Sequence, residues 1–465
     1  MPEKQENLMD KVGSLCKRRG FVFPGSEIYG GLANSWDYGP LGIELKNNIK
    51  KLWWKKFVQE RPDMVGLDAA LIMNPKVWEA SGHVANFNDP LVEDKKTHER
   101  FRLDHLLEEK GVNVSGMSFD DMVAEVEKLK LKSPAGNELT APRQFNMMFQ
   151  THLGPVADSE NTVYFRPETA QGMFVDFKTI QETMRMRLPF GIAQIGHAFR
   201  NEITPGNFIF RTREFEQMEI EYFVKPEEAD KHFEYWLQQQ KDWLRDIGVK
   251  DENLYFHEIP EVERAHYSKR SVDTEFKYPF GLKELYGIAY RTDYDLQAHS
   301  KHSGKMLSYR DPVTNEVVVP HVIEPTWGLN RTFLVVLLSA YEEVTARSGE
   351  DNAVHETEVV LHLPKNLAPI KVAILPLSKK EPLASVAQKI TADLRKHWMC
   401  QYDESGSIGK RYRRQDEIGT PYCVTVDFET IEKDDSVTIR DRDTTKQERV
   451  KIPDLQKVLE QKLAE

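Results

Sequence analysis

The sequence contains very little cysteine. Its three cysteines, Cys16, Cys400 and Cys423, lie far apart in 465 residues and form no Cys-x-x-Cys pair. Disulfide frameworks and thiolate metal sites both need closely spaced cysteines, so neither is predicted. We expect the three thiols to be buried side chains.

Long apolar segments are also missing. The N-terminal segment has no apolar stretch of signal-peptide length, and no run of about 18 apolar residues occurs anywhere in the chain. Hydrophobic residues make up 40% and charged residues 29% of the sequence. This composition is typical of soluble globular proteins. We therefore expect a cytoplasmic protein that has no membrane partner.

An excess of positive charge is absent as well, since the formal net charge is −11. Proteins that bind nucleic acid by bulk electrostatics usually have a net positive charge. This chain could therefore bind nucleic acid only through a local basic face. The sequence has no GxxxxGK[ST] loop, which excludes a P-loop nucleotide site.

The length predicts two or three domains, at about 150 residues for each. We interpret residues 1–92 and 141–360 as one domain and the charged segment 93–140 as an insertion within it. The insertion contains a Ser118-to-Asp121 capping pattern before a short helix. Strand and helix patterns alternate over 367–465, which predicts a separate α/β domain.

Three elements of the main domain follow from apolar spacing. Apolar residues recur at helical intervals from Pro40 to Phe57, which predicts an amphipathic helix. Residues 68–75 are expected to form a short buried strand that Pro75 ends, followed by a polar connection. The segment 327–341 is apolar nearly all round, which predicts a buried helix that begins at Gly328.

Polar residue types concentrate between Gly191 and Phe223, where two alternating segments flank the turn TPGN. Residues two apart in a strand share a face, so this hairpin has one polar face. An exposed sheet face would explain that row, and so would a nucleotide cleft, where arginines bind phosphate and an aromatic ring stacks on a base. The row comprises Gln194, Gly196, Ala198, Arg200 and Glu202, with Arg211, Arg213, Phe215, Gln217, Glu219 and Glu221.

These motifs resemble those of a known family. FRNE, RTREFEQME and the downstream GLNR resemble motifs two and three of class II aminoacyl-tRNA synthetases, and the helix after Pro40 resembles their dimer-forming motif one. With GFVFPGSEIYGGLANSWDYGPLG, RPETAQG, YRTDYDL and GSIGKRYRRQDEIGTPYC, nearly the whole chain is similar to the dimeric glycyl-tRNA synthetases. The resemblance implies an α+β catalytic domain, built on an antiparallel sheet flanked by helices, and a C-terminal α/β anticodon-binding domain.

The resemblance implies a site for ATP and Mg²⁺. Arg200 would contact the α-phosphate, Glu202 the adenine amine side, and Phe215 the adenine ring, while Arg211 and Arg331 would hold the distal phosphates. Glu284 would lie near ATP and its metal, although a solvated helix carboxylate is an equal reading of that residue alone. The full expected set is Arg200, Asn201, Glu202, Phe210, Arg211, Thr212, Arg213, Glu214, Phe215, Glu284, Leu285, Gly328 and Arg331.

The same resemblance implies a pocket for glycine, with carboxylates around its ammonium group. Glycine has no side chain to hold, so its affinity must come from its ammonium and carboxylate groups. The expected set is Arg102, Glu168, Phe215, Glu216, Gln217, Glu219, Arg291, Glu324, Thr326 and Gly328. Of these, Glu168 could equally be a first-turn helix carboxylate, and Thr326 stands where many relatives have serine.

Two further expectations concern RNA and zinc. The basic run in the C-terminal domain would ordinarily be a solvated loop, but the resemblance implies that Arg411, Arg413 and Arg414 contact the anticodon of tRNA(Gly). Many relatives carry cysteine pairs in the insertion that resemble a zinc knuckle. The corresponding segments here hold none, so no zinc site is predicted.

Two alternatives remain open. A class II synthetase for another small amino acid would share the same motifs, and SGH at Ser81 to His83 resembles the threonine group. A non-catalytic accessory protein that binds nucleic acid would resemble a synthetase too, but we would expect it to have lost residues such as Arg200 and Glu219, which are present.

Overall fold

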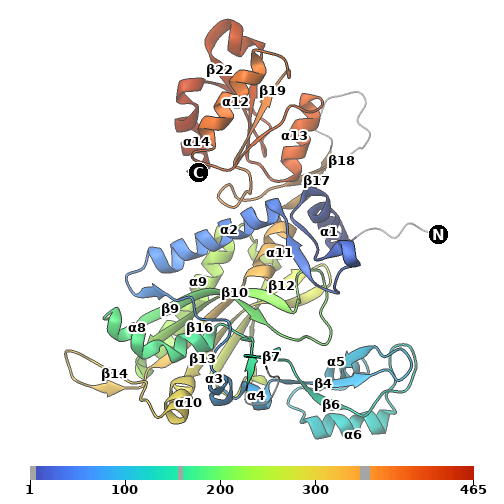
Figure 1. The fold of residues 1–465 in the computed structure, drawn as a ribbon, viewed down its shortest axis with the longest axis vertical. Helices are drawn as coiled ribbons and strands as arrows, with labels where there is room; N and C mark the ends of the chain where they lie inside the picture. The colour runs from blue at the N-terminus through green and yellow to red at the C-terminus, as the bar shows by residue number, and fades with distance from the viewer. Residues whose placement is uncertain (1–6, 156–160, 346–356, 465) are drawn as a thin grey trace.

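A computed structural model describes residues 7–155, 161–345 and 357–464. Figure 1 shows a large body built around one sheet, a small lobe beside it and a C-terminal domain at the opposite end. None of the helices in the described ranges combines the length and hydropathy that crossing a bilayer requires.

The large body is organised by a seven-stranded sheet in the order β11-β12-β13-β16-β10-β9-β3. All neighbouring strands are antiparallel except β3 and β9, which run parallel. The predicted antiparallel sheet with flanking helices is therefore confirmed. The strands are β3 Met64–Gly66, β9 Phe190–Phe199, β10 Glu214–Val224, β11 Leu254–Glu258, β12 Arg270–Tyr278, β13 Gly281–Thr292 and β16 His321–Gly328.

The two faces of this sheet carry different cores. Met218, Ile220 and Tyr222 of β10 face the larger core, which includes α1 Leu8–Arg19, α2 Pro40–Trp54, α9 Ala229–Asp246 and α11 Leu329–Ala340. Phe223 lies on the other face, in a smaller core with α7 Ala170–Val175, α8 Phe177–Thr183 and α10 Tyr294–Ser303. That second face also carries the polar row of the hairpin.

The predicted hairpin is confirmed, and the structure supplies its register. Phe215 lies opposite Ala198, Gln217 opposite Gly196, and Glu219 opposite Gln194. The period of two therefore places the polar row on one face, and Glu219 and Glu221 in it are buried. The alternative of a solvent-exposed sheet face is wrong for this part of the row.

The two predicted helices, which share the larger core, are also found. α2 buries Leu45, Ile49 and Trp53, and the chain continues as a π-helical turn, Lys55–Gln59, that buries Phe57. α11 follows Gly328 and is buried along nearly its whole length.

The strand expected at residues 68–75 is wrong. The strand lies earlier, at β3, and Pro75 opens the helix α3 Pro75–Ala80, where the side chain of Asn74 accepts from the Lys76 amide at 3.0 Å. Proline suits the first helical position because the amide hydrogen it lacks would have no partner there. The expected polar connection contains α4 His83–Asn86 and β4 Asn88–Glu93.

The insertion forms a small lobe of its own. β4 pairs with β5 Arg100–Arg102 and β6 Arg143–Asn146, so the lobe uses strands on both sides of the expected 93–140 segment. Helices α5 Leu103–Glu108 and α6 Phe119–Leu129 cover it, and the predicted capping box of Ser118 and Asp121 is present. Its buried apolar residues are Val92, Leu103, Leu106, Leu107, Leu131 and Leu139.

The C-terminal domain has a five-stranded sheet in the order β20-β19-β21-β22-β23. β19 pairs in parallel with β20 and β21, while β21, β22 and β23 are antiparallel. The predicted α/β character is confirmed. The elements are β19 Val372–Pro376, α12 Leu383–Leu394, β20 Cys400–Tyr402, α13 Ile408–Glu417, β21 Tyr422–Val426, β22 Ser436–Asp441, β23 Gln447–Lys451 and α14 Leu455–Ala464.

Short strands complete the described fold. β17 and β18 lead from α11 to the C-terminal domain and pair with each other; residues 346–356, inside the expected 141–360 segment, lie outside the described ranges. The remaining strands are β1 Val22–Pro24, β2 Trp36–Tyr38, β7 Gln150–His152, β8 Thr162–Tyr164, β14 Tyr309–Arg310, β15 Val317–Val318, β17 Tyr341–Thr345 and β18 Thr357–Leu361.

All three cysteines are free and buried, as expected.

Candidate active site

A cavity of about 420 Å³ opens over the polar face of the sheet, between β10, β13, β16 and the start of α11. It brings together most of the side chains that the sequence predicted. Those in its lining are Arg102, Glu168, Arg200, Glu202, Phe210, Arg211, Thr212, Phe215, Glu216, Gln217, Glu219, Glu284, Leu285, Glu324, Thr326, Gly328 and Arg331.

One end of the cavity is basic. Arg331, in the first turn of α11, pairs with Glu284 at 3.2 Å, donates to the Glu284 carbonyl at 3.0 Å, and lies over the Phe210 ring at 4.4 Å. The positive charge of Arg331 lowers the pKa of the Glu284 carboxyl. Glu284 lies on strand β13, so the alternative of a helix carboxylate is wrong.

Arg200 lies between two aromatic rings. Its guanidinium is 5.3 Å from the Phe215 ring and 5.4 Å from the Phe87 ring, and its Nε donates to the Pro167 carbonyl at 3.0 Å. These contacts fix the direction of the side chain while leaving further N–H groups for an anion. A guanidinium held in place is well suited to bind phosphate oxygens.

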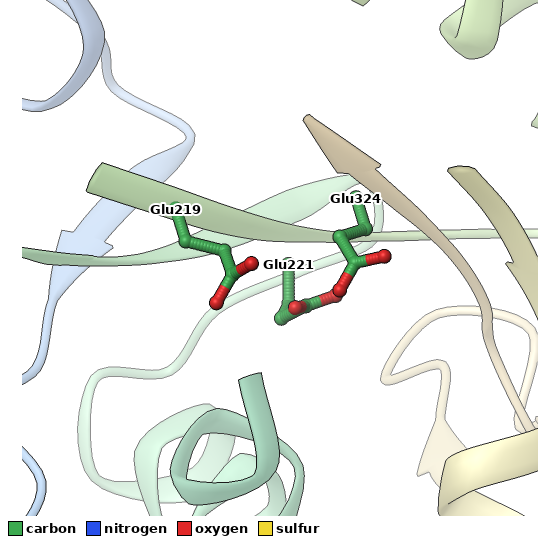
Figure 2. Close-up of side chains that lie close together, drawn as sticks. All are labelled: Glu219, Glu221 and Glu324. Atoms are coloured by element: carbon green, nitrogen blue, oxygen red, sulfur yellow. The ribbon is translucent and has the colours of Figure 1, made fainter. Parts of the chain in front are cut away.

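The other end of the cavity is acidic. Figure 2 shows that Glu219 and Glu221 of β10 and Glu324 of β16 point toward one another. One carboxyl oxygen from each lies within 4.8 Å of the others. Thr326 donates to Glu219 at 2.7 Å, and Thr169 donates to its second oxygen.

Arg291 of β13 compensates part of this negative charge from behind. It donates to Glu324 at 2.6 Å and to both oxygens of Asp295, at 2.8 and 2.9 Å, and it is almost fully buried. Glu168 accepts from Gln171 at 2.9 Å and lies 3.2 Å from the His83 ring nitrogen.

Burial determines how these acids ionise. It raises the pKa of Glu324 to about 8 and raises the pKa of Glu219 and of Glu221. Burial also acts to raise the pKa of Glu168, but His83 and Arg291 outweigh it and hold that pKa below its usual range. The acidic end therefore combines an ionised carboxylate with acids that an entering cation would help to ionise.

Four predicted residues lie outside the cavity lining. Arg213 and Glu214 line a second cavity, of about 830 Å³, and Arg213 donates to the Ala33 carbonyl at 3.3 Å. β10 begins only at Glu214, so the alternation of the strand does not extend back to Arg213. Asn201 is tied by its backbone N–H to the Met147 carbonyl at 2.7 Å, and Arg291 is buried behind the carboxylates.

The expected glycine contact of Glu216 does not fit the direction of its carboxylate. Glu216 borders the cavity, but its oxygens bind Lys46 and Lys50 of α2, at 2.5 and 3.2 Å, and His197 at 3.1 Å. Neighbouring strand residues point to opposite faces, so Glu216 turns away from the face of Gln217. Hydrogen bonds to Glu214 and Glu216 raise the pKa of His197 to about 9.

Several site residues were missed by sequence reasoning. His83, Thr169, Gln171 and Asp295 hold the glutamates in place, and three of them lie in RPETAQG and YRTDYDL, the motifs that carry the resemblance. Tyr267, whose ring lies 3.8 Å from the Arg291 guanidinium, has no signal in the sequence.

The basic run of the C-terminal domain is part of the fold. It forms helix α13, capped by Ser407, so the alternative of a solvated loop is wrong. Arg411 is only 2% exposed and donates to the Pro376 carbonyl at 2.6 Å, so its guanidinium is not available to RNA in this structure. Arg413 pairs with Glu358 at 3.0 Å and Arg414 with Asp403 at 2.6 Å, and both stay half-buried.

Comparison with known proteins agrees with this geometry. Residues 151–341 match the tRNA synthetase class II core domain (G, H, P, S and T), and residues 371–462 match the anticodon binding domain. The chain is 54% identical to the glycine–tRNA ligases of Caldanaerobacter subterraneus subsp. tengcongensis and Geobacillus thermodenitrificans, over 98% of each chain. It is 53% identical to that of Clostridium perfringens, over 98% of this chain and 99% of the relative. The chain therefore belongs to the glycine–tRNA ligase family.

Proposed function

We propose that the cavity binds ATP at its basic end and glycine at its acidic end. The chain joins the two into glycyl-adenylate, releases pyrophosphate, and transfers glycine to the terminal ribose of tRNA(Gly) with release of AMP. The observation that carries this proposal is the division of charge within one cavity, with Arg200, Arg211 and Arg331 in its lining together with Glu168, Glu219 and Glu324.

The chemistry needs this division. A carboxylate oxygen of glycine attacks the α-phosphorus, a new O–P bond forms, and the bond to pyrophosphate breaks. Both reactants are anions, so guanidinium groups fixed before the reaction lower its barrier by cancelling their repulsion. Arg200 is the residue that we assign to the α-phosphate, and we assign Arg211 and Arg331 to the distal phosphates. No protein nucleophile is required.

Glu284 fits a site for Mg²⁺ bound together with ATP. Its carboxylate is half-exposed, lines the cavity beside Arg331, and offers the oxygen ligands that this hard cation prefers. When bound, Mg²⁺ would neutralise charge on the phosphates.

The acidic end explains selection of a small amino acid. Carboxylates can bind the ammonium group of glycine. Thr326, which donates a hydrogen bond to Glu219, adds a methyl group beside the pocket. We propose that crowding here rejects side chains larger than hydrogen.

Amino-acid-dependent exchange of labelled pyrophosphate into ATP tests the proposal. We expect exchange with glycine and little exchange with alanine, serine, threonine, histidine or proline. Exchange with threonine or serine in place of glycine would favour a synthetase for another amino acid. Absence of exchange with every amino acid would favour the alternative of a non-catalytic accessory protein that binds nucleic acid.

We propose two partners on other surfaces. The C-terminal domain would bind the anticodon region of tRNA, with Arg413 and Arg414 at its half-buried basic helix. A second copy of the chain would pack through α2, since the segment before this helix exposes Ile28 and Tyr29 by 88% and 86% and α2 itself exposes Ile43.

We also propose that hydrogen bonds hold the insertion lobe without zinc. The fully buried carboxylate of Asp94 accepts from the amides of Lys96 and Thr97, at 2.8 and 3.0 Å. It also accepts from Ser133 at 2.5 Å and from the Asn137 side chain at 3.0 Å, which joins the two turns of the lobe.

A metal chelator is therefore expected to leave both the melting temperature and the charging rate unchanged once Mg²⁺ is restored. Asp94→Ala should make the lobe a preferred site of limited proteolysis, because four donors lose their acceptor. His98→Ala, at an exposed position in the same turn, is the control and should digest like the parent. Chelator-induced unfolding of the lobe would contradict the proposal.

A further inference from the structure

Glu221 is a buried acid to which no role has yet been given. It lies on β10 two residues beyond Glu219, is 0% exposed, and does not line the cavity. Among the residues that the structure describes, neither of its carboxyl oxygens has a hydrogen-bond partner. Figure 2 shows the carboxyl directed at the space between Glu219 and Glu324.

The surroundings of Glu221 hold more negative than positive charge. Arg291 supplies one positive charge, which Asp295 and Glu324 share, and Arg166 supplies another that acts on Glu219. His83 beside Glu168 adds a third only when it is protonated. Charged, titratable and amide groups face the cluster from both strands and helices. They are His83, Arg166, Glu168, Gln171, Gln194, Glu219, Tyr267, Arg291, Asp295, His299 and Glu324.

Glu221 is best accommodated here as a neutral acid. An ionised carboxylate with no partner and no water contact costs far more than a protonated one. Glu221 makes no hydrogen bond with any described residue, but Glu219 and Glu324 each have a carboxyl oxygen within 4.8 Å of one of its own. Burial raises the pKa of Glu221, and the negative charges of these two neighbours raise it further. A pair of carboxyls this close gives up its protons in two separate steps.

We infer that Glu221 is a positioning residue that keeps a proton beside Glu324, and that this proton makes the three-carboxyl cluster a site for the glycine ammonium group in preference to a divalent metal ion. The inference rests on the proposed function, which places glycine at the acidic end of the cavity.

The reason is the charge of the cluster. Three ionised carboxylates gathered this closely form a site for a hard divalent cation, and Mg²⁺ enters the same cavity with ATP. With Glu221 neutral, Glu219 and Glu324 carry at most two negative charges, part of which Arg291 offsets. A single positive charge then suffices, and the ammonium group supplies it.

The raised pKa of Glu324 predicts a direction of pH dependence. Burial raises the pKa of Glu324 to about 8, so at neutral pH a larger share of this carboxyl is protonated in the empty pocket than in water. The ammonium group favours ionised Glu324, so glycine binding releases a proton near neutral pH. The KM for glycine should therefore fall as pH rises from about 6 to about 8, by up to about tenfold per unit.

Two substitutions of nearly equal size test whether position 221 must carry a hydrogen-bond donor. Glu221→Gln keeps a hydrogen-bond donor but cannot ionise, whereas Glu221→Leu removes the donor. In pyrophosphate exchange we expect Glu221→Gln to keep the KM for glycine within about threefold of the parent, and Glu221→Leu to raise it about tenfold or more. The KM for ATP should stay within about twofold in both variants, and inhibition by excess Mg²⁺ should remain weak in Glu221→Gln.

Three results would overturn the inference. One is an equal loss of glycine affinity in Glu221→Gln and Glu221→Leu, and another is parental behaviour of both variants. If the variants fail to fold, calorimetry of glycine binding to the parent in two buffers of different ionisation enthalpy decides: about one proton should be released near neutral pH, and no release overturns the inference. Absence of glycine-dependent exchange in the parent would instead contradict the proposed function.

Discussion

Substitution of Arg200 by alanine is expected to lower glycine-dependent pyrophosphate exchange by about 10²- to 10³-fold, the usual loss when one fixed charge-stabilising donor is removed. The guanidinium is fixed by the Pro167 carbonyl and by the rings of Phe87 and Phe215, so little motion is needed when charge grows at phosphorus. The fold should survive, because the side chain is half-buried and has no partner carboxylate among the ion pairs of the described residues.

Arg213→Ala is the matched control for this experiment. It removes the same group from the same hairpin, but from the second cavity, where Arg213 donates to the Ala33 carbonyl. Exchange by Arg213→Ala should stay within about threefold of the parent. An equal loss in both variants, or parental exchange by Arg200→Ala, would remove Arg200 from the phosphate role.

Substitution of Arg291 by methionine is expected to lower the free energy of unfolding by about 3–5 kcal/mol. Arg291 is the guanidinium that pairs with both Asp295 and Glu324, and all three side chains are at least nine-tenths buried. Its loss leaves two buried carboxyl groups without their positive partner, and the KM for glycine should rise as well. The stability deficit should narrow as pH falls, because protonation removes the uncompensated charge.

Arg270→Met is the control in denaturant titrations. Arg270 also pairs with two carboxylates, Glu234 and Glu258, but at a more exposed site, where such pairs contribute less than about 1 kcal/mol. Equal stability losses in the two variants would contradict the view that Arg291 is the charge on which the acidic pocket depends.

The sequence predicted those parts of the site where one regular period runs unbroken. Alternation along β10 placed Phe215, Gln217 and Glu219 on one face, and the spacing of apolar residues located α2 and α11. It failed where the period stops. Arg213 precedes the strand and turns to the second cavity, and Arg411, which was expected to contact RNA, is buried in a helix.

The partners of buried charged groups could not be predicted from the sequence either. Glu216 and Glu219 are both glutamates of one strand, yet one binds two lysines of α2 and the other binds two threonines beside the pocket. The alternation of the strand determines the face on which each carboxylate lies. Its partners on that face come from segments that are distant in the chain. For the same reason, no pattern in the sequence indicated that Glu221 would lack a partner.

Charging of tRNA(Gly) by the purified chain measures glycine activation and glycine transfer together. Labelled glycine, alanine, serine and threonine should be offered separately with ATP and Mg²⁺, with a second tRNA as control. We expect glycine to be attached to tRNA(Gly) only when ATP is present, and we expect the other three amino acids and the control tRNA to give only background. Attachment of threonine or serine with glycine left at background would show that the chain is specific for another amino acid.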